Sequence, residues 1–130
     1  MIGIDTNLLI RMAMQDDPIQ SAKVDLFLAS LSRQEVGFIS LVTLIESVWV
    51  LGKRYNRSKP DIVRFVQELL DAPELTMERA EAVSQALQRF KSSQADFADC
   101  LIERLGALAG CRETVTVDRN ASKFAGMRLI

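Results

Sequence analysis

MIGIDTN, residues 1–7, opens the chain and is followed directly by the apolar run LLI of residues 8–10. An apolar run that ends in a carboxylate predicts a short buried strand over residues 2–5, after which Thr6 or Asn7 can start a helix. In an open parallel sheet, ligands bind at the carboxyl ends of the strands. Asp5 is therefore placed where a protein of this kind usually carries out its chemistry.

The composition is that of a soluble globular protein, with 48% hydrophobic and 25% charged residues in a length of 130 that fits one domain. No apolar run approaches the roughly 20 residues of a membrane span. Asp5 and Arg11 interrupt the first apolar stretch, so we expect no signal peptide. Cys100 and Cys111 lack metal-ligand spacing, which predicts a reduced, cytoplasmic chain without a membrane partner.

Residue types that the chain lacks narrow its chemistry. There is no histidine, which excludes Ser-His and Cys-His catalysis and histidine-ligated zinc. The six glycines are scattered and form no GxxxxGK[ST] phosphate loop. Because the formal net charge is -1, binding of a polyanion has to depend on a local basic patch or on a metal.

Apolar strands alternate with amphipathic helices along the chain. We expect strands over residues 2–5, 36–39, 74–77, 114–117 and 127–130. We expect helices over residues 6–14, 19–31, 41–55, 60–71, 78–90 and 96–108, with Ser40 as a cap and Pro60 in a first turn. This alternation implies a parallel sheet covered on both faces. The predicted fold is a single α/β domain over residues 1–130, a three-layer α/β/α sandwich with a short central parallel sheet.

Four carboxylates stand out against apolar surroundings. Asp5 and Asp118 each end an apolar strand, so one parallel sheet would bring them to the same edge. Glu46 is the only charge in LVTLIESVWVL, residues 41–51, and a lone acid on such a helix is costly to bury. Asp99 lies in the first turn of an apolar helix, three residues after Asp96 on the same face.

Each acid also has a purely structural interpretation. Asp96 is a good helix N-cap, an interpretation as strong as a metal role. An acid after a strand, such as Asp5 or Asp118, is often only a turn residue, and Glu46 could reach solvent from the rim of its helix. If the four carboxylates converge, they repel one another, and a hard cation such as Mg²⁺ or Mn²⁺ would neutralise this repulsion. Such a site binds a phosphodiester oxygen, activates a water and stabilises the leaving oxygen.

These four motifs, in this order and at these spacings, resemble the PIN domain family, and more closely the VapC toxins of bacterial type II toxin–antitoxin systems. The resemblance covers the chain from Ile2 to the closing GMRLI of residues 126–130. It implies a divalent-metal-dependent endoribonuclease that acts on RNA. It also implies a homodimer that is neutralised by a small VapB-type antitoxin.

The resemblance assigns roles to individual residues. Asp5 and Asp99 would be the direct metal ligands, Glu46 would position or deprotonate the attacking water, and Asp118 would complete the shell. The supporting positions would be Thr6, Asn7, Asp96 and Thr116. The missing histidine is no obstacle, because metal-activated water replaces the general base.

Basic and apolar side chains outside the acidic positions allow two interpretations. The basic run from Lys53 to Lys59, which includes Arg54 and Arg57, is either a solvated helix end or a phosphate-contacting rim in which Tyr55 stacks on a base. Arg119 and Lys123 follow the last acid and could contact RNA.

Trp49 and Phe65 are expected in the core. In the resembling family, residues 19–70 hold the antitoxin peptide and contribute dimer contacts, but the sequence does not separate groove from core.

Two other functions remain open. One is a PIN-like module that binds a partner but no longer cuts, which four retained acids argue against. The other is a different magnesium-dependent phosphotransfer enzyme, such as a phosphatase. That class generally has Asp-x-Asp at the first strand end, whereas here Asp5 is followed by Thr6 and Asn7.

Overall fold

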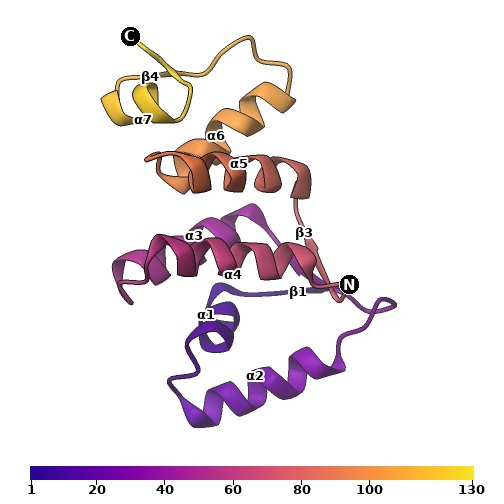
Figure 1. Cartoon of the computed structure of the whole chain (residues 1–130). Helices are drawn as coiled ribbons and strands as arrows, with labels where there is room; N and C mark the ends of the chain where they lie inside the picture. The colour runs from indigo at the N-terminus through magenta and orange to yellow at the C-terminus, as the bar shows by residue number, and fades with distance from the viewer. The chain divides into compact units, whose positions relative to one another are not determined.

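The computed structural model describes residues 1–130, which form two compact units, Met1–Glu78 and Arg79–Ile130 (Figure 1). The first unit, indigo to magenta, contains strands β1 to β3 and helices α1 to α4. The second, orange to yellow, contains helices α5 to α7 and strands β4 and β5. Each unit therefore has its own short sheet and its own set of helices.

A three-stranded parallel sheet organises the first unit. Its strands are β1 (Ile2–Gly3), β2 (Gly37–Ile39) and β3 (Leu75–Met77), in the order β1-β2-β3. A Cβ added at Gly37 would lie 3.0 Å from atoms of both the Ile4 and the Leu75 side chains, so a larger residue would push these side chains away from the central strand. Glycine is thus the residue that lets its neighbours pack closely over β2.

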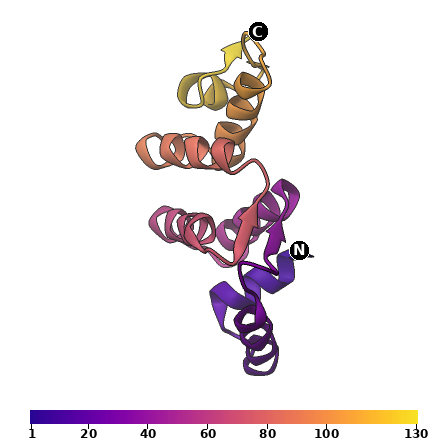
Figure 2. The same ribbon diagram turned by 90° about the vertical axis from the view of Figure 1, so that its right-hand side faces the viewer.

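The helices of the first unit begin where polar side chains cap them. They are α1 (Thr6–Met14), α2 (Pro18–Ser30), α3 (Leu41–Lys53) and α4 (Lys59–Asp71). Asp5, Asp17, Ser40 and Ser58 occupy the N-cap positions, and each accepts a hydrogen bond from a backbone N–H in the first turn of its helix. Helix α1 packs against α2 and α3, and α4 packs against α3 and β3 (Figure 2).

The second unit is built on the packing of α5 (Ala80–Ser92) against α6 (Phe97–Leu108). Phe97 is 1% exposed, and its ring meets that of Phe90 edge to face with the centroids 5.7 Å apart. After α6 follow β4 (Val115–Thr116), α7 (Arg119–Phe124) and β5 (Arg128–Leu129), and β4 pairs with β5 in parallel.

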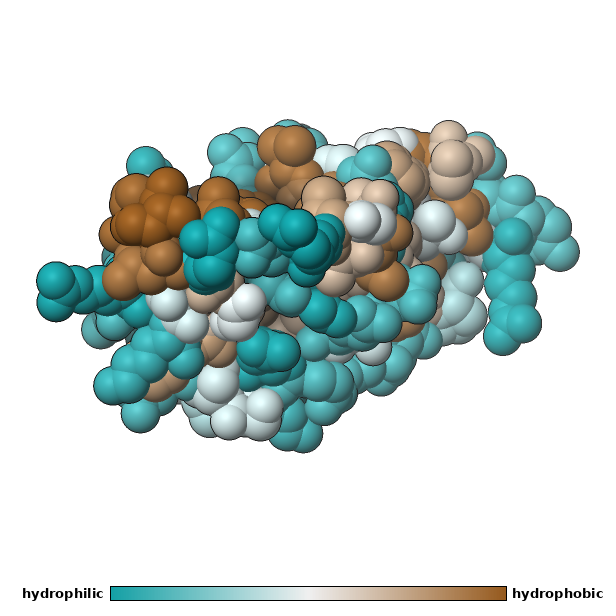
Figure 3. All heavy atoms as spheres, turned by 90° about the horizontal axis from the view of Figure 1, so that it is seen from above, coloured by the Kyte–Doolittle hydropathy of each residue, from teal (hydrophilic) through white to brown (hydrophobic).

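Apolar side chains also reach the surface. Figure 3 shows apolar atoms in brown among the teal polar surface of one face. In the second unit Val115, Val117 and Ile130 are exposed, and in the first unit Ile19, Leu26 and Val42 are exposed. None of the helices combines the length and apolar character that crossing a membrane would need.

The predicted elements are confirmed within a few residues at their ends, with the following differences. The first strand ends at Gly3, because Asp5 caps α1 and leaves the extended strand. Helix α7 was not predicted, since its six residues are too few for a periodic pattern. Trp49 is 53% exposed on α3, whereas Phe65 is buried as expected; Trp49 lies on the outer face, two residues after the buried Ser47.

The strands that precede Asp5 and Asp118 do not share a sheet. Strand β1 belongs to the three-stranded sheet, and β4 pairs only with β5. Strands of two residues carry too little side-chain pattern to specify their neighbours. The expectation that one sheet edge gathers both acids is therefore corrected: each acid ends a strand of a different sheet.

Candidate active site

Asp5 lies at the point where β1 passes into α1. It is exposed, and its Oδ2 accepts a hydrogen bond of 3.2 Å from the backbone N–H of Asn7. A carboxylate at a helix N-terminus is favoured by the helix dipole, and the cap occupies only one of its oxygens. Thr6, the first residue of α1, is buried, while the Asn7 side chain is exposed. Asp5 is thus held in place by the backbone and keeps an oxygen available for a ligand.

Helix α3 is tied to the residue before Asp5. The Thr43 hydroxyl donates to the Ile4 carbonyl at 3.3 Å, and the Thr43 N–H donates to the Ser40 hydroxyl at 3.1 Å. Glu46 follows Thr43 by three residues and so shares its face of the helix. The Glu46 side chain is exposed and makes no hydrogen bond or ion pair. The first unit therefore presents two acids, Asp5 and Glu46, with oxygens that are not committed.

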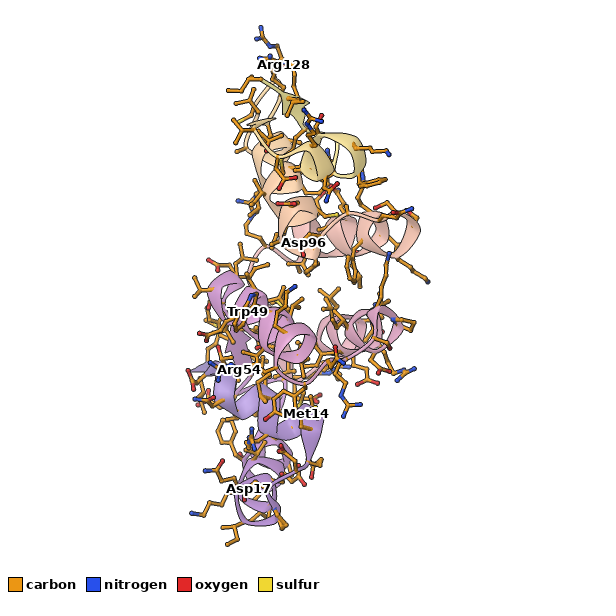
Figure 4. The ribbon with its side chains drawn as sticks, turned by 90° about the vertical axis from the view of Figure 1, so that its left-hand side faces the viewer. Met14, Asp17, Trp49, Arg54, Asp96 and Arg128 are labelled. Carbon is orange, nitrogen blue, oxygen red and sulfur yellow. The ribbon has the colours of Figure 1, made fainter.

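In the second unit, Asp96 immediately precedes α6 (Figure 4). Asp96 occupies the N-cap position, but its side chain makes no capping hydrogen bond. Asp96 therefore has the position expected of a helix cap, but its side chain does not form the hydrogen bond of a cap. Its carboxylate is exposed and is left free beside Asp99, which lies three residues further on.

Asp118 and Thr116 form the other acidic element of the second unit. Asp118 caps α7 by accepting from the Ala121 N–H at 3.0 Å, and its own N–H donates to the Thr116 hydroxyl at 3.0 Å. Thr116 thus holds the turn in which Asp118 sits. This gives a physical role to the polar residue two positions before the last acid.

The pKa of Asp99 is raised, chiefly by burial and then by the negative charges of Asp96 and Asp118. Asp99 makes no hydrogen bond or ion pair that would offset this repulsion. A divalent cation would relieve it, since hard cations prefer carboxylate oxygens. The donors therefore fit such an ion, although no three acidic or cysteine side chains gather in the structure as a preformed metal site.

The raised pKa of Asp99 predicts that its charge destabilises the metal-free fold. Stability is lost as the pH rises from the unfolded-state pKa of aspartate, about 3.9, through the raised folded-state pKa, and the loss is complete above it. We therefore expect Asp99→Asn to unfold at a higher temperature than the unsubstituted chain at pH 7 in chelator. The two should unfold alike near pH 3.

Thermal unfolding at both pH values measures this difference, with Asp25→Asn as the matched control. Asp25 is exposed on α2, and its Oδ1 accepts from Gln15, a bond that asparagine can keep. A lower unfolding temperature for Asp99→Asn than for the unsubstituted chain at pH 7 would contradict the expectation.

The basic residues predicted to contact RNA are exposed in both units. Lys53, Arg54 and Arg57 lie at and beyond the end of α3 (Figure 4), and Arg119 and Lys123 lie one turn apart on α7, directly after Asp118. Tyr55 is a different case. Its hydroxyl accepts a 2.8 Å hydrogen bond from Arg11 and its ring is half-buried, so the structure holds it against α1 instead of freeing it to stack on a base.

A cavity of about 370 Å³ lies in the first unit, between the end of α1 and the first turns of α4. Met12, Met14 and Phe65 supply apolar walls, and side chains of both charges line the rest: Arg57, Asp61, Arg64 and Glu68. Met12 and Met14 thus line a cavity, whereas Ile10 of the same helix is buried in the core.

Capping acids that follow short strands, together with unpaired acids on α3 and at the start of α6, are carboxylates of the kind that hold a divalent cation in proteins acting on phosphodiesters. The chain matches the PIN domain over residues 2–127 and belongs to the PIN domain family. No curated protein matches it. PIN domains are nuclease-type modules that generally depend on a divalent metal. Membership confirms the predicted α/β/α fold class with its short parallel sheet.

Proposed function

We propose that the chain is a VapC-type toxin, a Mg²⁺- or Mn²⁺-dependent endoribonuclease whose residues 1–130 act as a single PIN domain in the cytoplasm. Its substrate is RNA, and its partners are a VapB-type antitoxin and a second copy of the chain. Support comes from the family, since PIN nucleases generally bind RNA and often pair with antitoxins.

The observation that carries the proposal is that the acids lack partners. Glu46, Asp96 and Asp99 have neither a hydrogen-bond donor nor a cation on their carboxylates. For the half-buried Asp99, a charge left without a partner beside Asp96 and Asp118 is unfavourable unless a cation compensates it. Three uncommitted acids in a nuclease-type fold favour a catalytic use.

We assign the chemistry to Asp5, Glu46, Asp99 and Asp118, the four acids on which the resemblance to VapC toxins rests. A bound divalent ion would supply Lewis-acid activation of a water and of the phosphodiester. As the resemblance implies, Asp5 and Asp99 would each act as a direct metal ligand, through oxygens that no internal hydrogen bond uses. Glu46, exposed and unpaired, would orient the attacking water and accept its proton. Asp118 would complete the site while its other oxygen caps α7.

Exposed apolar residues support the protein partners. Ile19 and Leu26, seven residues apart on α2, are 73% and 75% exposed and would offer apolar contacts to a partner chain. The cavity lined by Met12, Met14 and Phe65 would suit the antitoxin peptide, because flexible methionines adapt to a bound chain.

The test is cleavage of labelled total RNA by the purified protein, freed of any antitoxin, with Mg²⁺, with Mn²⁺ and with chelator. We expect cuts at discrete sites in the presence of metal and none in chelator, because the acids alone have no means of activating water. Cleavage that persists in chelator would overturn the metal-dependent mechanism.

Absence of cleavage by metal-loaded protein would favour the alternative of a PIN-like binding module. Release of phosphate from a small monoester such as p-nitrophenyl phosphate, without cutting of RNA, would favour a phosphatase.

A further inference from the structure

A second cavity, of about 470 Å³, lies in the second unit between α5 and α6. All of its lining residues are polar, and none is acidic: Gln85, Gln88, Arg89, Ser92 and Arg104. The four on α5 follow one another at helical spacing, so they form a single row that faces Arg104 of α6. Such a wall offers hydrogen-bond donors and positive charge.

Arg104 is held rigidly in this wall. Its guanidinium bonds both oxygens of Glu103, with 2.6 Å from Nη2 to Oε1, and its Nη1 donates to Gln85 Oε1 at 3.3 Å. These bonds use three of the five N–H donors, and two remain. Because the Gln85 oxygen is occupied by Arg104, the amide group of Gln85 is left as a further donor.

Arg89 is the unpaired charge of the cavity. Its guanidinium makes no hydrogen bond or ion pair with any other residue. It lies close against Gly126, where an added Cβ would come within 2.9 Å of Nη1. Gly126 has a φ of +80°, which glycine adopts readily and which leaves this space open for the guanidinium.

The charges around the cavity do not balance. Glu103 is bonded to Arg104, which lowers its pKa, and the charge of Arg89 adds to this lowering. One carboxylate beside two guanidiniums leaves an excess of one positive charge. The remaining N–H donors of Arg104 are held in place by its bonds to Glu103 and Gln85. An oxyanion of charge −1 would both neutralise the excess and satisfy the donors.

We propose that the cavity between α5 and α6 binds a phosphate group of a single-stranded RNA through the guanidiniums of Arg89 and Arg104 and the amide of Gln85. The ligand class rests on the proposed function, since the RNA substrate brings the phosphates. No aromatic residue lines the cavity, so it holds the backbone of the strand and reads no base. It is distinct from the basic residues after Asp118 and at the end of α3.

The test is binding of a labelled 20-nucleotide single-stranded RNA of mixed sequence, measured in chelator so that no cleavage is needed. We expect Arg89→Gln to weaken binding on the order of tenfold at low salt, because it removes a charge-assisted contact. The slope of log K against log [KCl] should fall by about 0.7, the value for one phosphate contact on a single strand. Arg89→Lys, which keeps the charge, should retain the slope.

Lys91→Gln is the matched control, since Lys91 is exposed on the same helix and does not line the cavity. Equal losses for Arg89→Gln and Lys91→Gln would overturn the proposal. Binding of inorganic phosphate is measured in parallel. If phosphate binding depends on Arg89 but RNA binding does not, the cavity holds free phosphate and the proposal is also overturned. Arg89-dependent binding without metal-dependent cleavage would reject the nuclease and leave the phosphate site standing.

Discussion

Replacing either Asp5 or Asp99 by asparagine is expected to lower the rate of metal-dependent RNA cleavage by about a hundredfold or more. Each substitution removes a negative charge from a position at which the proposed site needs an oxygen ligand. Asparagine offers one neutral oxygen, which binds Mg²⁺ far less strongly than a carboxylate does. The loss should therefore appear in kcat/KM and in metal affinity together.

Asparagine is the informative substitution because it preserves the fold at these positions. Asn caps a helix about as well as Asp, so Asp5→Asn can still accept from the Asn7 N–H. The same holds for Asp118, which accepts from the Ala121 N–H, and Asp118→Asn forms the third member of the series. A loss of activity in these variants cannot then be attributed to a lost cap.

The measurement is kcat/KM on a labelled RNA fragment at several Mg²⁺ concentrations, with Mg²⁺ binding followed by calorimetry. Asp25→Asn, on the exposed surface of α2, should behave like the unsubstituted chain. Full activity of both Asp5→Asn and Asp99→Asn would remove the acids from the mechanism. The chain would then remain a PIN domain whose cutting site is elsewhere.

Phe97→Ala is expected to destabilise the fold by about 3–5 kcal/mol, the usual range for deleting a buried aromatic ring. Phe97 is among the largest fully buried side chains, and its contact with Phe90 adds an edge-to-face interaction. A typical domain is stable by only about 5–15 kcal/mol, so this one change would remove a large part of the total. Because Phe97 lies between Asp96 and Asp99, the start of α6 would lose its anchor.

Urea unfolding measures this loss, with Ile102→Ala on the same helix as the control. Ile102 is 52% exposed, so its truncation should cost well under the value for Phe97. Similar losses for the two variants would mean that the core of the second unit does not depend on the α5–α6 packing around Phe97.

The elements that the sequence predicted well are those with local signals. Helix α1 begins at Thr6 because Asp5 caps it, and α3 begins after Ser40, as the pattern of apolar and capping residues indicated. Helix α7 escaped prediction because its six residues carry no periodic pattern and because Asp118 was interpreted as a site acid or a turn residue, although the same carboxylate caps the helix that follows. A capping acid and a catalytic acid look alike in a sequence.

No local sequence signal indicated which strands pair or that a cavity lies between α5 and α6. Strands β1 and β4 are two residues long, too short for a pattern that selects a neighbour. Arg89 and Arg104 are separated by fifteen positions and read as ordinary surface charges of two helices. They line one cavity only because α5 packs on α6, and Arg89 finds room only beside a glycine at position 126.

The amino-acid sequence by itself determined the α/β class and nearly all of the helices and strands, because these follow from periodicity, caps and residue order. The tertiary structure alone decided that Asp96 makes no cap bond, that burial and then the charges of Asp96 and Asp118 raise the pKa of Asp99, and that Trp49 faces outward. It also decided that Glu103 pairs with Arg104 and leaves Arg89 without a partner. These properties depend on side chains brought together through space, and the free energy of a charge depends on every group around it.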